Sequence, residues 1–88
     1  MIGLIEHINP HGMRLMEAEF FICDKILESF CLEREGVRIV HGFNRGTAIR
    51  NFVRHGSLLK HLRKHYPEVG SVSMTRKDPG VTYVFFNT

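Results

Sequence analysis

A long amphipathic stretch, Arg14 to Glu33, constrains the fold more than any other feature of the sequence. Its apolar side chains recur at helical spacing, so we predict a helix that Gly36 stops. Short apolar runs flank it, Ile2 to Ile8 and Val37 to Val40, and both are typical of strands. A strand, a crossover helix and a second strand form a unit whose two strands are parallel.

The remainder of the chain predicts a second helical region and a hairpin. A helix is expected to begin near Thr47, and His55-Gly56-Ser57 divides it into one kinked helix or two short ones, with Ser57 capping the restart. Two strands follow, Val69 to Met74 and Val81 to Asn87, with turn residues between them. The order β-α-β-α-β-β predicts one α/β domain over residues 1–88, an α+β two-layer sandwich of a four-stranded mixed sheet and two helices.

The long predicted helix carries more apolar surface than one sheet contact needs. One stripe, expected to face the sheet, consists of Leu15, Ala18, Ile22, Ile26 and Phe30. A second stripe at the same spacing consists of Met16, Phe20, Cys23, Leu27 and Cys31. Two interpretations stay open: a loop or a neighbouring helix covers the second stripe, or the stripe forms a homodimer interface.

The acidic residues are unevenly distributed. Of nine acids, seven lie between Glu6 and Glu35, and none occurs from Gly36 to Pro67. That stretch nevertheless holds the basic residues Arg38, Arg45, Arg50, Arg54, Lys60, Arg63 and Lys64, together with four histidines. An acid-free segment concentrates positive potential, as a phosphate-binding surface requires, so nucleic acid is the favoured partner over a merely solvated basic face.

Within this segment, a strand, a loop and a helix are predicted to form the candidate site. The loop from His41 to Gly46 follows the strand, and ligands of α/β sheets gather where strands end. Helix N-termini attract phosphate, and Arg50 and Arg54 lie at i, i+4 on one helix face. His11 follows the first strand and should lie at the same sheet edge, where it either takes part in acid–base chemistry with His41 or hydrogen-bonds its own loop.

The sequence does not indicate a membrane protein, a disulfide-bonded protein or a metalloprotein. No apolar run is long enough for a membrane span, and the first residues lack the features of a signal peptide, so we expect a cytoplasmic protein without membrane contact. Cys23 and Cys31 are too far apart on one helix to bridge and are expected to be reduced, packed thiols. His61 and His65 have a metal-compatible spacing but lack neighbouring acidic or thiol ligands, so no metal or cofactor is expected.

The motifs around both histidines resemble those of the Smr (small MutS-related) domain. The similarity involves His11-Gly12, Glu17-Ala18, Val37 to Gly42, Gly46 and Ile49-Arg50, and extends from about Leu4 to Pro67. The resemblance implies a β-α-β-α-β-β fold similar to the C-terminal domain of bacterial translation initiation factor three. It also implies DNA or RNA binding and, as in several members, endonuclease activity that nicks DNA or cleaves RNA.

The resemblance assigns candidate roles to individual residues. His11 matches the histidine of the family's Leu-Asp-x-His motif, and Asn9 occupies the aspartate position. His41, Gly42 and Gly46 match part of a His-Gly-x-Gly-x-Gly loop, although Phe43-Asn44-Arg45 replaces its middle glycine. The family's helix arginine corresponds to Arg50, which comes one position late. The candidate catalytic residues are His11, His41 and Asn9. Of the candidate nucleic-acid-binding residues, Gly42, Gly46 and Arg50 match the family's motifs. Phe43, Arg45, Arg54 and Lys60 are added because they lie in the loop or on the basic segment.

The two departures from the family pattern weaken catalysis more than binding. An amide at Asn9 cannot act as a base, although it can hold an imidazole by a hydrogen bond. Phe43 either stacks on an unpaired base or packs under the loop. The sequence therefore predicts a nucleic-acid-binding Smr-like domain, with endonuclease activity through an altered site left open. The alternative function is a non-catalytic protein-interaction or dimerisation module.

Overall fold

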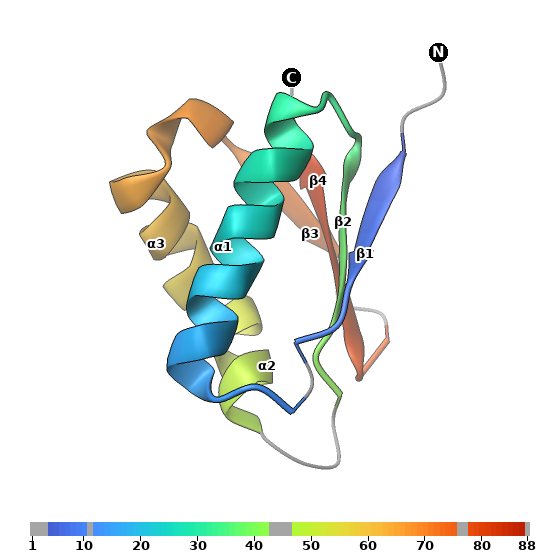
Figure 1. The fold of residues 1–88 in the computed structure, drawn as a ribbon, viewed down its shortest axis with the longest axis vertical. Helices are drawn as coiled ribbons and strands as arrows, with labels where there is room; N and C mark the ends of the chain where they lie inside the picture. Colours follow the sequence, from blue (N-terminus) through green and yellow to red (C-terminus); the bar gives the residue numbers. More distant parts are fainter. Residues whose placement is uncertain (1–3, 11, 43–46, 76–77, 88) are drawn as a thin grey trace.

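Four strands and three α-helices follow one another in the computed structural model of the chain, which describes residues 4–10, 12–42, 47–75 and 78–87 (Figure 1). In chain order they are β1 (Ile5–Ile8), α1 (Leu15–Cys31), β2 (Gly36–Val40), α2 (Thr47–Arg54), α3 (Ser57–His65), the short 3₁₀ helix η1 (Pro67–Val69), β3 (Val72–Thr75) and β4 (Val81–Phe86). The predicted β-α-β-α-β-β order is confirmed.

The strands form one mixed sheet in the order β1-β2-β4-β3. β1 and β2 run parallel, as the crossover helix between them requires, with Ile8 beside Ile39. β4 pairs antiparallel with both β2 and β3. The chain therefore places its last strand inside the sheet, next to β2, and leaves β1 and β3 at the two edges.

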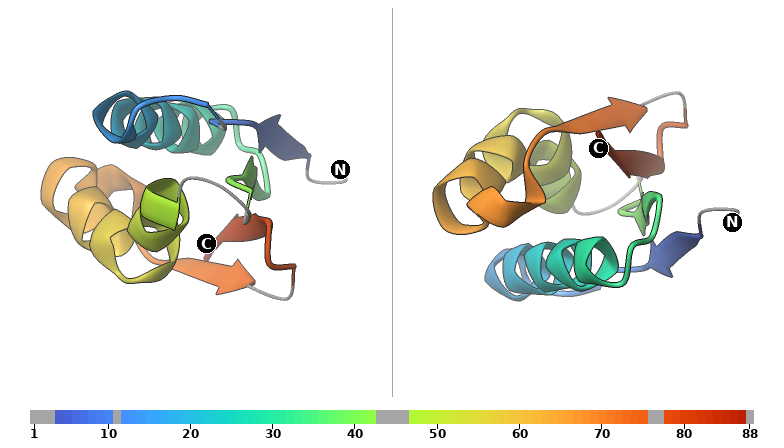
Figure 2. Two further views of the ribbon diagram at one scale, coloured as in Figure 1. Left: turned by 90° about the horizontal axis from the view of Figure 1, so that it is seen from below. Right: turned by 90° about the horizontal axis from the view of Figure 1, so that it is seen from above.

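All three α-helices cover one face of this sheet, which gives the predicted two-layer arrangement (Figure 2). The apolar core lies between the layers, where side chains that alternate along the strands meet the helices. It consists of Ile8, Ala18, Ile22, Cys23, Ile26, Val37, Ile39, Ile49, Phe52, Val53, Leu58, Leu62, Val69 and Val84. None of the helices in the described residues is both long and apolar enough to span a membrane.

Helix α1 ends before the glycine that was expected to stop it. The last helical residue is Cys31, and Glu33 then adopts a left-handed conformation with φ of 59°. The Arg34 amide bonds to the Ser29 carbonyl at 2.9 Å and so closes the helix end. The prediction that Gly36 ends the helix is therefore wrong, because Gly36 is the first residue of β2.

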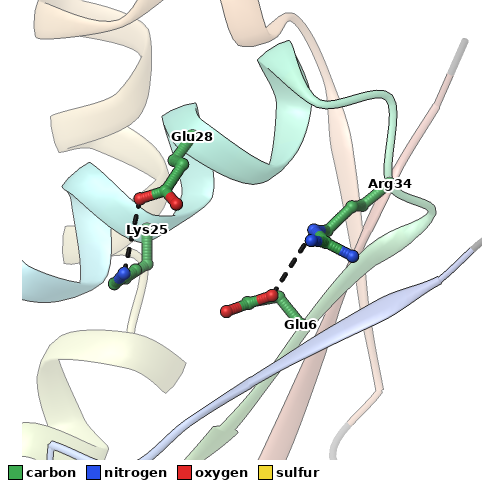
Figure 3. A network of polar contacts seen from close by, with 4 residues as sticks. All are labelled: Glu6, Lys25, Glu28 and Arg34. Carbon is green, nitrogen blue, oxygen red and sulfur yellow. Dashed lines mark hydrogen bonds and ion pairs between the residues drawn. The ribbon is translucent and has the colours of Figure 1, made fainter.

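An ion pair connects the turn after α1 to β1 (Figure 3). Arg34 Nε lies 3.4 Å from Glu6 Oε2, and both side chains are about one-third exposed or less. Glu6 belongs to the helix-facing side of β1, where an unpaired carboxylate would be costly. Lys25 and Glu28 pair on the outside of α1 at 3.3 Å, where solvent reduces the contribution of such a pair.

The second helical region consists of two helices rather than one. Gly56 has φ of +87°, a conformation that side chains disfavour, and it separates α2 from α3. Gly56 is also the N-cap of α3, so the expected capping role of Ser57 is wrong. The strand predicted from Val69 begins later, at Val72, because Val69 belongs to η1 and packs into the core.

Neighbouring elements cover only part of the second apolar stripe of α1. Cys23 is fully buried, and burial raises the pKa of its thiol to about 12, with the charges of Asp24 and Glu19 adding to the effect. Near the start of the helix, Met16 and Phe20 are 70% and 61% exposed. The two cysteines are free, as predicted, but Cys31 is exposed rather than packed.

Gly36 is the one glycine of the sheet that a side chain would overlap. An added Cβ would lie 2.3 Å from the Val84 carbonyl oxygen and 3.1 Å from the Phe85 ring. We therefore expect Gly36→Ala to lower the free energy of unfolding by about 2 kcal/mol or more, because the β2–β4 ladder must shift. Urea denaturation measures this loss. The control is Gly80→Ala, whose Cβ has no neighbour closer than 3.7 Å. An equal loss of stability in the two variants would contradict the close approach of β4 to Gly36.

Candidate nucleic-acid interface

The candidate site lies where β1 and β2 both end, at the lower end of the sheet in Figure 1. Parallel pairing brings these two ends together, as predicted. Asn9 is exposed and Pro10 is buried after β1, and His41 and Gly42 follow β2. Helix α2 also begins at this end (Figure 1). We call this region the carboxyl edge. His11 lies outside the described residues, so its position beside His41 stays a prediction.

His41 is buried at the carboxyl edge, with 1% of its surface exposed. Both ring nitrogens make hydrogen bonds: Nδ1 lies 2.8 Å from the Gly42 carbonyl oxygen, and Nε2 lies 2.9 Å from Thr82 Oγ1. The carbonyl oxygen can only accept, so Nδ1 carries the proton and Nε2 accepts from the Thr82 hydroxyl. The surroundings thus hold His41 as the neutral Nδ1–H tautomer.

Arg54 completes the same network from the last turn of α2. Its Nε donates to Thr82 Oγ1 at 2.9 Å, which leaves the hydroxyl proton directed at His41. Its Nη2 donates to the carbonyl oxygens of Val81, at 2.9 Å, and Asp78. The guanidinium therefore connects α2 to the β3–β4 hairpin. Its Nε and Nη2 donors are already hydrogen-bonded within the protein.

The pKa of His41 is lowered from the ordinary value of 6.5. Burial is the main cause, because it disfavours the imidazolium, and the nearby charges of Arg54 and Arg50 act in the same direction. The hydrogen bond to Gly42 and the charge of Asp78 oppose the shift. His41 is therefore neutral at physiological pH, in agreement with its hydrogen bonds.

The backbone around His41 is anchored to the turn before β4. The amides of His41 and Gly42 both donate to the Gly80 carbonyl oxygen, at 3.1 and 3.0 Å. The Gly80 amide in turn donates to Asp78 Oδ1 at 2.9 Å. The Gly42 amide thus already has a partner in the protein, which makes it a poor donor to a phosphate.

The other predicted binding residues are distributed over two helices. Arg50 lies on α2 and is half-buried, close enough to His41 for its charge to lower the pKa of the imidazole. Lys60 is exposed on α3, a different helix from the one that follows the His41 loop. Phe43, Arg45 and Gly46 lie outside the described residues, and their predicted roles stay predictions.

The two histidines of α3 that have a metal-compatible spacing lie close together. The centroids of His61 and His65 are 4.6 Å apart. Among the residues that the structure describes, no group of three or more histidine, cysteine or acidic side chains is arranged to hold a metal ion.

Sequence reasoning missed the partners that the hairpin contributes. Thr82 is a fully buried polar residue in a largely apolar strand, which is a weak signal because threonine is also common in strands. Asp78 and Gly80 were recognised only as turn residues. Their contacts with Arg54 and the His41 loop depend on the antiparallel pairing of β4 with β2, which the order of elements alone does not fix.

Comparison with known proteins identifies the fold. The Smr domain of Thermus thermophilus MutS2 is similar in structure, with a TM-score of 0.68 and 22% sequence identity. The similarity covers 94% of this chain and 99% of that domain, so it confirms the predicted Smr-like fold. The sequence matches no protein-family model and no curated protein.

The lowered pKa of His41 predicts how stability depends on pH. Below about pH 6.5 the unfolded chain binds a proton at this histidine and the folded protein does not, so acid lowers stability until the pH passes the folded pKa. We expect His41→Asn to remove this part of the loss between pH 7 and pH 5, as measured by urea denaturation across the range. His55→Asn, at an exposed histidine, serves as the control. A pH profile of His41→Asn that matches the wild type would contradict the burial of a neutral imidazole.

Proposed function

We propose that this Smr-like domain binds nucleic acid at the carboxyl edge. The observation that carries the proposal is the position of α2, whose basic side chains Arg50 and Arg54 adjoin the ends of two parallel strands. These elements belong to the acid-free segment from Gly36 to Pro67, which concentrates positive potential, and Asp78 of the hairpin is the acidic residue whose charge acts on His41. The Smr-like fold supports the same partner, because the family resemblance implies DNA or RNA binding.

The residues of the carboxyl edge have two roles: one contacts phosphate, and the others position the loop after β2. Arg50 is the best candidate for a phosphate contact, since it lies on the first turn of α2, where the helix dipole adds positive potential. Arg54, Thr82 and His41 hold the loop after β2 against the hairpin and thereby set its position. We assign them positioning roles.

Hydrolysis is not part of the proposal. A general base must reach its proton through an available lone pair, and the Nε2 lone pair of His41 accepts from Thr82. Asn9 has no basic group, as the sequence already indicates. The endonuclease prediction therefore depends on His11, whose variant His11→Ala should then abolish any cleavage of RNA or supercoiled DNA.

Binding should depend strongly on salt and on Arg50. Each phosphate contact contributes about 0.7 to 0.9 to the slope of log affinity against log salt, so Arg50→Ala should lower the slope by about that amount. Filter binding across a salt series measures both affinity and slope. Arg63→Ala is the matched control, because it removes an exposed arginine from α3. Absence of binding at low salt, or equal slopes for Arg50→Ala and the wild type, would contradict the proposal.

Exposed apolar side chains on α1 favour a second function, dimerisation. Met16 and Phe20 are the most exposed large apolar residues of the described chain, and with Arg14 and Glu17 they line a shallow hollow of about 530 Å³. Burying such side chains between two copies would remove them from water.

Sedimentation equilibrium tests the dimer. If α1 forms the interface, Phe20→Gln should weaken self-association at least about tenfold, because a buried aromatic anchor contributes strongly to an interface. Leu32→Gln, at an exposed residue just past the other end of α1, is the control and should behave as the wild type. A wild-type protein that stays monomeric at high concentration would exclude this function.

A further inference from the structure

The sheet has a second face, opposite the helices, which we call the open face. No helix of the described residues lies over it (Figure 2). Strand pairing places His7, Arg38, Tyr83 and Thr75 in one row that crosses all four strands. A neighbouring row consists of Ile5, Gly36, Phe85 and Ser73.

Two aromatic rings stack on one another in the centre of the open face. Tyr83 and Phe85 are two residues apart on β4, so both point away from the helices. Their ring centroids are 5.7 Å apart and their planes differ by 4°. Both side chains are partly exposed, so their rings are accessible from the open face. Because the two rings stack on one another, a planar group can extend the stack on the outer face of either ring.

Phe85 covers a glycine of the neighbouring strand, whereas Tyr83 does not. Phe85 lies against Gly36, with its ring 3.1 Å from the place that a Cβ would occupy, and so covers the glycine of the neighbouring strand. Tyr83 pairs across the sheet with Arg38 and Thr75 instead. Covering a glycine therefore explains Phe85 but leaves the partly exposed ring of Tyr83 unexplained.

The charge of the open face is positive or neutral. Arg38 and His7 lie on one side of Tyr83, on β2 and β1. On the other side Ser73 and Asn87 form a neutral pair, with the serine hydroxyl donating to the amide oxygen at 2.9 Å. The described strand residues that alternate onto this face include no aspartate or glutamate, since Glu6 belongs to the helix-facing side. Stacking rings beside an acid-free basic group suit unpaired bases joined by phosphates.

We propose that the open face binds a single-stranded segment of RNA or DNA, with bases stacked on Tyr83 and Phe85 and phosphates beside Arg38. This inference rests on the proposed nucleic-acid binding and specifies the form of the nucleic acid. Duplexes are excluded from such a surface, because their bases are already stacked on one another. Since β2 leads from Arg38 to His41 within about 10 Å, one strand of nucleic acid can reach both the open face and the carboxyl edge.

Tyrosine fluorescence tests the stacking without disturbing the open face. The chain has no tryptophan and two tyrosines, so Tyr66→Phe leaves Tyr83 as the single tyrosine. We expect short single-stranded RNA and DNA oligonucleotides to quench its emission, after correction for absorption, and a blunt-ended duplex without unpaired bases to leave it unchanged. Binding of single strands without quenching would overturn the inference, whatever the stability of other variants.

A second variant measures the effect of the ring on affinity. Tyr83→Leu should weaken binding of the single strands about tenfold and change duplex binding less than about twofold. Unchanged single-strand affinity, or an equal loss for single strands and duplex, would overturn the inference while leaving the proposed function intact. A wild-type protein that binds neither form at low salt would overturn both.

Discussion

The arrangement of the carboxyl edge depends on one partly buried chain of hydrogen bonds, from Arg54 through Thr82 to His41. These residues come from α2, β4 and the loop after β2, which are brought together only in the folded protein. Each donor meets one acceptor, and the chain ends on the Gly42 carbonyl oxygen. Because an unsatisfied buried polar group costs about 1 to 3 kcal/mol, the three side chains constrain one another.

This network determines what kind of function the edge can have. A neutral imidazole whose two nitrogens are occupied holds a loop in place but is poorly suited to exchange protons with a substrate. Positive charge remains on α2, where Arg50 adjoins the network. The same sheet presents Tyr83 and Arg38 on its opposite face. Binding of an extended nucleic acid therefore fits the molecule better than hydrolysis at His41.

Local patterns predicted the elements, and contacts between distant residues account for what they missed. The parallel pair β1–β2 and the break at Gly56 followed from apolar spacing and turn residues. Gly36 was misread as a helix stop, because Glu33 takes the left-handed conformation that glycine usually supplies. In the site, the helix positions of Arg50 and Arg54 were foreseeable from i, i+4 spacing. The partners of Arg54 on the hairpin were not, since they depend on the placement of β4 beside β2.

The tautomer of His41 tests its positioning role most directly. Long-range ¹H–¹⁵N NMR correlation of the imidazole distinguishes a protonated from an unprotonated ring nitrogen. We expect the Nδ1–H form at neutral pH, both in the free protein and at saturation with a single-stranded oligonucleotide, because Thr82 and Gly42 hold the ring in either state. An imidazolium, or an Nε2–H form that appears on binding, would show that the substrate engages His41 directly and would contradict the positioning role.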